Sequence, residues 1–208
     1  YAYPPRWGMV SPEEIDRIDV IYGPFSALYP GNSVGGVLSI HTRMPEGREV
    51  HVRGMGAAQT FNYNGYGATP LSGNFNVLLG DKIGDGFRVF GTWNHLDSQS
   101  QPMTFGGNAV LPTTVGSTGN SQGPSFLGGS YGVNSYGYPS IWTAATGIAH
   151  TVQDMAKVKM SYDIEPETRV YYQAGFWTNM QNTDVKSYIT DTHGIPIYNT
   201  QSGFVEYA

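Results

Sequence analysis

The chain has 208 residues, enough for one ordinary globular domain or for part of something larger. Its net charge of −5 and pI near 5.4 argue against a nucleic-acid partner, because phosphate affinity rests on Lys and Arg. Cysteine is absent, which excludes disulfides and thiolate metal sites. Only 13% of the residues are charged, about half the share found in soluble domains, whereas Gly and aromatic residues are abundant. This composition is typical of a β-protein in apolar surroundings.

Two kinds of targeting segment are missing from the sequence. No run approaches the roughly 18 consecutive apolar residues of a transmembrane helix, whereas the strands of a transmembrane barrel need only alternate. The chain begins Tyr1-Ala2-Tyr3 without a basic or apolar leader, so there is no secretory signal to interpret. Export therefore has to be inferred from the rest of the sequence.

The first predicted elements lie between residues 11 and 40. Ser11, Pro12 and Glu14 form a capping-box pattern, which predicts a single short helical turn. The alternating stretch 15–21 and the apolar stretch 37–40 predict two strands.

From Arg48 onward the sequence reads as strands joined by connections of two kinds. We expect strands near 48–60, 72–83, 87–98, 149–163 and 168–185. The connections at 84–86 and 164–167 are tight turns, whereas those at 61–71 and 99–148 are long. Alternating short turns and long loops are typical of an outer-membrane barrel.

The alternation is clearest in the last two predicted strands. In 155–163, the first face carries Ala156, Val158, Met160 and Tyr162, and the second carries Lys157, Lys159, Ser161 and Asp163. In a barrel the first face would meet lipid and the second the lumen, whereas in a soluble β-sandwich the first would be buried. Strands of about 12 to 18 residues favour the barrel, since about 9 to 11 residues cross a bilayer.

Residues 15–43 resemble the closing part of the plug domain of TonB-dependent outer-membrane receptors. The match runs in order through an acidic-hydrophobic strand at 15–21, Gly23-Pro24, Ser26-Ala27-Leu28-Tyr29, Gly35-Gly36-Val37 and a last strand ending at Thr42-Arg43. The resemblance implies an all-β membrane protein: an antiparallel transmembrane β-barrel of about 22 strands, with an N-terminal plug domain in its lumen. This chain would cover only part of that fold, with residues 1–45 as the C-terminal part of the plug and 46–208 as the first barrel strands.

The resemblance also assigns roles to plug residues. In the family, charges on the plug strand pair with the inner barrel wall, which gives Arg17, Asp19 and Asp16 as locking candidates. Gly23, Pro24, Gly35 and Gly36 would form the plug turns, where Gly permits tight backbone approaches.

The predicted external loop at about 99–148 is unusual in composition. From Ser98 to Gln153 there is no Asp, Glu, Lys or Arg. Aromatic residues are interspersed there with Gly, Ser, Asn and Thr, as in binding loops, and a self-packed loop without ligand contact is the alternative. The candidate ligand contacts are Phe105, Phe126, Tyr131, Tyr136, Tyr138 and Trp142.

Catalytic and metal chemistry finds no support in the sequence. The five His residues include no i, i+4 pair and no nearby carboxylates at metal-site spacing. No nucleophile elbow or phosphate-binding loop occurs. We therefore expect no enzyme activity, no metal site and no cofactor.

The resemblance implies a receptor that takes up a scarce nutrient through the bacterial outer membrane, with a ferric siderophore as the leading substrate. Its partners would be TonB, through a segment not in this chain, a small-molecule ligand such as a metal chelate, and outer-membrane lipid. A secreted or surface β-sandwich binding protein and a passive porin are the alternatives. The sequence does not identify the substrate, because most of its site would lie on strands absent here.

Overall fold

The computed structural model describes residues 7–22, 36–106, 109–110, 127–133, 136–199 and 206–207. Contacts divide the chain into two compact units. The first unit comprises Tyr1–Met55, Asn74–Leu96 and Val152–Asn179, and the second comprises Gly56–Gly73, Asp97–Thr151 and Met180–Ala208. The predicted plug and barrel boundary after residue 45 stays a prediction.

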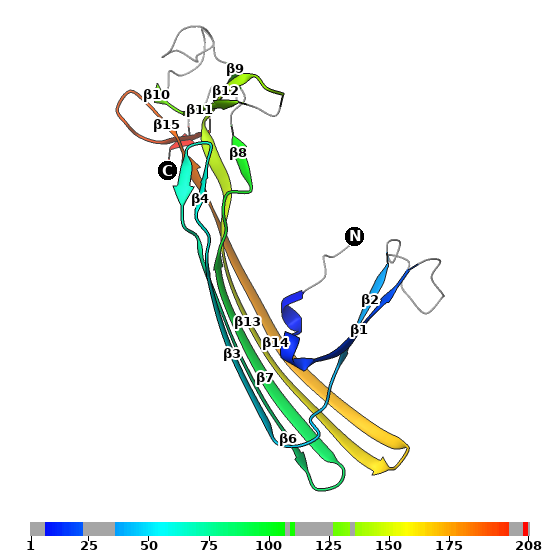
Figure 1. The fold of residues 1–208 in the computed structure, drawn as a ribbon. Helices are drawn as coiled ribbons and strands as arrows, with labels where there is room; N and C mark the ends of the chain where they lie inside the picture. Colours follow the sequence, from blue (N-terminus) through cyan, green and yellow to red (C-terminus); the bar gives the residue numbers. More distant parts are fainter. Residues whose placement is uncertain are drawn as a thin grey trace. The chain divides into compact units, whose positions relative to one another are not determined.

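The first unit begins with two short 3-10 helices and a β-hairpin, which we call the N-terminal segment (Figure 1). Its elements are η1 (Trp7–Met9), η2 (Pro12–Glu14), β1 (Ile15–Ile21) and β2 (Val37–Thr42). The two strands pair antiparallel, with Ile18 opposite Ile40 and Val20 opposite Leu38. The predicted short turn and both predicted strands are confirmed. Within the described ranges, no helix is both long and apolar enough to cross a membrane.

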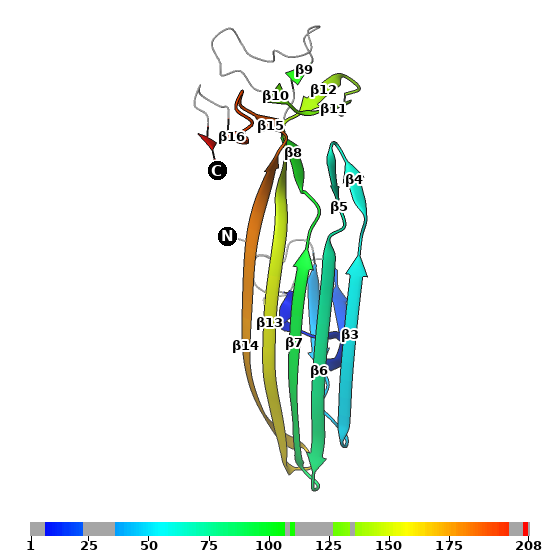
Figure 2. The ribbon, with the colours of Figure 1, turned by 90° about the vertical axis from the view of Figure 1, so that its left-hand side faces the viewer.

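A sheet of long strands dominates the fold (Figure 2). Its main strands are β3 (Glu49–Ala58), β6 (Leu71–Ile83), β7 (Phe87–Gln99), β13 (Ala144–Glu165) and β14 (Thr168–Ser187). Their order is β14-β13-β7-β6-β3, and neighbouring strands run in opposite directions. All five predicted long strands are therefore confirmed, and β13 begins five residues earlier than expected because its first residues pair with β8 (Thr104–Gly106).

The connection between β3 and β6 holds a hairpin that the sequence analysis treated as loop. It consists of β4 (Phe61–Tyr63) and β5 (Tyr66–Ala68). Asn64 and Gly65 link them with φ of 47° and 80°, the left-handed conformation that a two-residue hairpin turn requires. The Asn-Gly pair was therefore the signal that the prediction missed.

The expected long loop is also partly strand in the described residues. Besides β8, it contains β9 (Ala109–Val110), β10 (Leu127–Gly128), β11 (Ser130–Val133) and β12 (Pro139–Trp142). After β14 follow β15 (Ile189–Thr190), β16 (Ile197–Asn199) and β17 (Glu206–Tyr207). Strands β11, β12 and β9 form one sheet, and β10 pairs with β15. These short strands pair locally within the segment predicted as a long external loop, and its external position stays a prediction.

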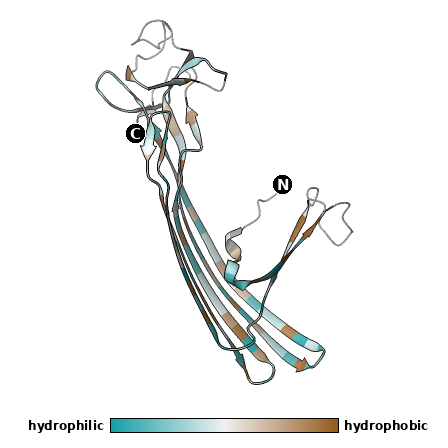
Figure 3. Ribbon diagram, in the orientation of Figure 1, coloured by the Kyte–Doolittle hydropathy of each residue, from teal (hydrophilic) through white to brown (hydrophobic). Residues whose placement is uncertain are grey.

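Apolar and polar residues are interspersed along the long strands (Figure 3). In β13 the side chain of Lys157 is buried, whereas that of Val158 is exposed. Leu78, Phe90 and Met155 are buried together with the polar residues Asn76 and Ser161. We call the face of Lys157 the inner face and the face of Val158 the outer face. In the first unit, the N-terminal segment lies against the inner face.

Candidate functional site

A buried ion pair joins the N-terminal segment to the inner face. Lys157 Nζ lies 2.9 Å from both Glu14 Oε1 and Oε2, and it also donates to Met9 O at 2.8 Å. Glu14 is fully buried, and the Lys157 side chain is 8% exposed. Because buried charges require partners, removal of either side chain would leave the other uncompensated.

The local sequence explains why Glu14 reaches this position. Ser11 N donates to Glu14 Oε1 at 2.7 Å, which is the carboxylate half of the predicted capping box. The short helix thus holds the Glu14 carboxylate in place, and both of its oxygens can still accept hydrogen bonds from Lys157 on β13. The sequence pattern identified Glu14 as a helix-start residue but gave no sign of Lys157 as its partner.

A close backbone approach supports the same contact. A Cβ atom on Gly8 would lie 2.6 Å from Gln153 Oε1 and 3.1 Å from Trp177 Nε1. Such distances leave no room for a larger residue without movement of the neighbours. Gly8 therefore allows η1 to lie directly on β13 and β14.

Further polar contacts follow along the segment. Arg53 Nη1 donates to Glu13 Oε1 at 3.1 Å, and Lys159 Nζ donates to Thr42 Oγ1 at 2.7 Å. Arg43 Nη1 lies 2.9 and 2.8 Å from the two oxygens of Glu49. These contacts connect both ends of the segment to β3 and β13.

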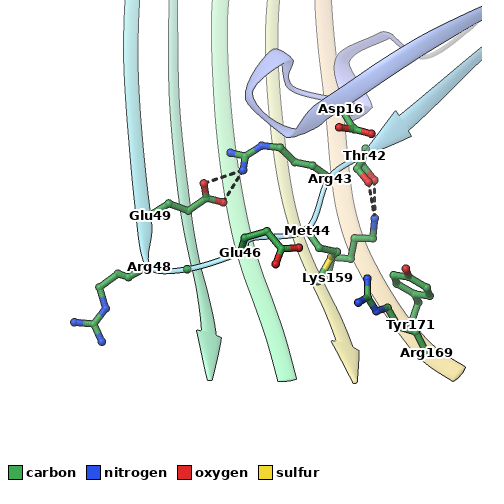
Figure 4. Close-up of a pocket in the computed structure, with 11 residues that line it drawn as sticks. Asp16, Thr42, Arg43, Met44, Glu46, Arg48, Glu49, Lys159, Arg169 and Tyr171 are labelled. Atoms are coloured by element: carbon green, nitrogen blue, oxygen red, sulfur yellow. Dashed lines mark hydrogen bonds and ion pairs between the residues drawn. The ribbon is translucent and has the colours of Figure 1, made fainter. Parts of the chain in front are cut away.

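An open pocket of about 850 Å³ lies beside these contacts (Figure 4). Charged side chains of both signs line it, which makes it polar. They come from β1, from residues 43–49 and from the long strands. The charged lining residues are Asp16, Arg43, Glu46, Arg48, Glu49, Lys159 and Arg169.

The predicted locking residues occupy two places. Arg17 Nε donates to Asp19 Oδ2 at 3.3 Å, and His41 Nε2 lies 2.8 Å from the same oxygen, so these three residues interact within the hairpin. Asp16 instead lines the pocket, near Thr42 in Figure 4. Their locking role stays a prediction. The contacts with the sheet come from Glu13, Glu14 and Thr42, which the sequence analysis did not nominate.

The predicted plug turns lie mostly beyond the described residues. Gly23, Pro24 and Gly35 fall outside them. Gly36 directly precedes β2. Their role as turn residues stays a prediction.

The outer face of the first unit exposes apolar side chains. Leu79 is 54% exposed, Val158 38% and Phe176 67%. Together with Trp93 they surround a shallow groove whose lining also includes Gly91, Ala156 and Ala174. In a soluble sheet such residues would form the core, so their exposure marks a surface for an apolar partner.

In the second unit, aromatic rings gather into a cluster. The rings of Phe105 and Trp142 are 6.3 Å apart, and Phe105 also lies 6.5 Å from Phe61 and 5.5 Å from Tyr63. Tyr66 extends the cluster through Phe61 at 6.1 Å. Edge-on and offset ring contacts at these distances are favourable. Two predicted ligand contacts, Phe105 and Trp142, are thus brought together.

The other predicted loop aromatics lie elsewhere. Tyr131, Tyr136 and Tyr138 are exposed, and Phe126 falls outside the described residues. The cluster members Phe61, Tyr63 and Tyr66 were missed. Their spacing around the Asn-Gly turn, on both strands of one hairpin, was the available signal. Contact of any of these residues with a ligand stays a prediction.

Metal ligands do not gather in the part of the chain that the structure describes. No group of three or more His, Asp or Glu side chains there is arranged to hold a metal ion.

Comparison with known proteins gives one distant relationship. No family model and no solved structure matches the chain. The chain is similar to the "Ferric enterobactin receptor PirA" of Pseudomonas aeruginosa, with 31% identity over 119 residues. The match covers 51% of this chain but only 14% of that receptor, so the chain spans a small part of the relative's length. This similarity supports, at most, the receptor family that residues 15–43 resemble.

Proposed function

We propose that this chain is part of a TonB-dependent receptor that takes up a ferric siderophore through the bacterial outer membrane. One observation carries the proposal: the inner face buries polar and charged side chains under the N-terminal segment, and the outer face exposes apolar ones. A transmembrane barrel requires this arrangement, with apolar residues toward lipid and polar residues toward the lumen. A soluble β-sandwich requires the opposite for Val158 and Phe176.

The edges of the sheet support a barrel. Strands β3 and β14 are the two ends of the strand order, and β14 is 20 residues long. Exposed long edges are unfavourable in water and impossible in lipid, where every backbone group needs a partner. In the complete receptor, further strands would pair with both edges and close the barrel.

In this proposal the N-terminal segment is the last part of a plug in the lumen. Glu14 and Lys157 fix it to the wall, while Arg17 and Asp19 interact within the hairpin and Asp16 faces the charged pocket. TonB would supply the energy that rearranges the plug. The chain itself performs no covalent chemistry in this scheme.

The substrate class rests on the relative and on the second unit. The relative is named for ferric enterobactin, a siderophore complex. The aromatic cluster around Phe105 lies in a segment without Asp, Glu, Lys or Arg, where stacking and neutral hydrogen bonds are available to a ligand. We therefore propose a ferric siderophore as the substrate.

Uptake of radioactive iron by cells that carry the complete receptor tests the proposal. Cells with the receptor should accumulate ferric siderophore, and deletion of TonB should abolish uptake. Surface binding without TonB should persist, because binding precedes the energised step. Uptake that continues without TonB would identify a passive porin instead, and a receptor that stays water-soluble would support the sandwich.

A further inference from the structure

The outer face of the first unit carries polar side-chain pairs at two levels. His95 Nδ1 lies 2.9 Å from Asp154 Oδ1, between β7 and β13. The His95 ring also stacks on Trp93 of the same face, with centroids 6.0 Å apart. Toward the turns at 84–86 and 166–167, Arg48 Nε lies 3.2 Å from Asp81 Oδ2 on β6.

Between these levels, the outer face of β13 is free of charge. By alternation with Val158, it presents five side chains between Asp154 and the turn at 166–167. They are Ala156, Val158, Met160, Tyr162 and Ile164. Neighbouring strands contribute Leu79, Trp93 and Phe176 beside the groove. The five β13 side chains include no Asp, Glu, Lys or Arg, so a charged partner would find no counterpart among them.

The height of this uncharged band matches the thickness of the hydrocarbon layer of a membrane. From Asp154 to Ile164, the last outer-face residue of β13, there are ten residue steps, which at about 3.3 Å each give about 33 Å of strand. A barrel strand tilted by about 40° would then rise about 25 Å, which matches the apolar band of about 25 Å on membrane barrels. A docked protein would impose no such limit on both sides of the band.

We infer that membrane hydrocarbon covers the outer face of β13 from Ile164 up to Asp154 and ends at the His95–Asp154 pair. Strand β13 therefore leaves the lipid near residue 154, about halfway along its 22 residues. Trp93 lies just inside this limit, at the depth that Trp prefers in membrane interfaces. The inference rests on the proposed function and adds to it the depth at which the barrel lies.

Site-directed spin labelling tests the depth. These 208 residues contain no Cys, and any Cys elsewhere in the complete receptor would first be replaced by Ser so that each variant carries one label. The complete receptor in phospholipid vesicles would carry one nitroxide at V158C, M160C, H150C or Q173C. Labels at 158 and 160 should collide with oxygen and lose collisions with a water-soluble nickel complex. The label at 150, beyond the proposed limit, and the label at 173, on the inner face of β14, should retain nickel collisions.

The outcomes separate the depth from the function. Nickel access at 158 and 160 would overturn lipid contact and the proposed function together. Protection at 150 equal to that at 160 would leave the receptor in the membrane but overturn the limit at Asp154. Labels at 158 and 160 shielded from both reagents would show a protein partner, such as a second copy, on this face.

A measurement without substitution on β13 covers the case in which a labelled variant does not fold. Every Trp of the complete receptor except Trp93 would be replaced by Phe, in this chain Trp7, Trp142 and Trp177, so that only Trp93 emits. Lipids brominated near the headgroup should quench Trp93 more than lipids brominated at the chain end. The reverse order would place Trp93 in the bilayer centre and overturn the limit.

Discussion

Lys157 and Val158 are neighbours in β13, yet their side chains meet opposite surroundings. Lys157 is held by Glu14 and Met9 O and is almost completely buried, whereas Val158 is exposed on an apolar face. In water-soluble sheets, apolar side chains are buried and charges are solvated. The comparison shows that one face of this sheet exposes apolar side chains and the other holds a charge in a polar contact, which is the arrangement that the proposed barrel requires.

The two faces of the sheet are also stabilised by different kinds of interaction. On the inner face, burial of a charge makes the contact depend on particular partners, since a single missing partner is costly. On the outer face, stabilisation depends on the total apolar area and hardly on the identity of any one residue. Substitutions on the two faces should therefore behave differently.

Removal of the inner cation should have the largest effect. Lys157→Met leaves the Glu14 carboxylate buried and unpaired, which costs about 3–5 kcal/mol for such pairs. The amides of residues 11–14 should lose exchange protection by about two to three orders of magnitude, as measured by hydrogen exchange on the complete receptor. Addition of Glu14→Gln should recover most of the protection, because it removes the unpaired charge. Lys82→Met removes a cation from a different strand, β6, and should change the exchange protection of residues 11–14 little. Equal losses of protection in the two variants would contradict a specific role of the Glu14–Lys157 pair in holding the N-terminal segment.

A charge on the outer face should have the next largest effect. Met160→Lys places an ammonium near the middle of the apolar band and should destabilise the membrane-inserted state by about 2–4 kcal/mol. Gln173→Lys introduces the same charge on the inner face of β14 and should change stability little. Urea titration of the receptor in lipid vesicles, followed by the gel mobility of unheated samples, measures both. Equal losses would remove the distinction between the faces.

Disruption of the aromatic cluster should have a smaller effect. Phe105→Leu keeps most of the apolar volume and removes ring contacts worth about 0.5–1.5 kcal/mol each. The midpoint temperature of thermal unfolding should therefore be lower than in the unsubstituted protein. Tyr131→Leu, at a position that is 55% exposed, is the matched control and should change the free energy of unfolding by less than about 0.5 kcal/mol. A cluster that only packs would show this loss with unchanged siderophore affinity, whereas one that binds ligand would show both losses.

The smallest effect concerns a turn in the second unit. Ile195 N and His193 N donate to Asp191 Oδ1 at 2.9 and 2.8 Å, and these bonds hold the pKa of Asp191 below its ordinary value. Their stabilisation is complete above the unfolded pKa of about 4 and is lost as the pH falls through the lower folded pKa. The amide shifts of His193 and Ile195 should therefore titrate below pH 4, and Asp191→Asn should abolish this titration. A midpoint above 4 would contradict the assignment.

The sequence by itself determined the strands and their two faces. Alternation and turn residues are local properties, so the bounds of β1 follow closely from its alternation, and those of β6 and β7 from the tight turn at 84–86. The match through residues 15–43 suggested the receptor family for the same reason, because an ordered motif can be read without any contact. Short paired strands such as β11 and β12 were missed, since their pairing depends on partners more than on their own pattern.

Only the tertiary structure decided which residues meet. Glu14 and Lys157 are 143 residues apart in the chain, and nothing in either local pattern points to the other. The same holds for Phe61 and Phe105, which stack from different connections. Periodicity determines the face of the strand on which a side chain lies. Which residue that side chain contacts depends on how distant parts of the chain fold together. The sequence therefore showed which residues are charged or aromatic. It did not show the Glu14–Lys157 ion pair or the aromatic cluster around Phe105.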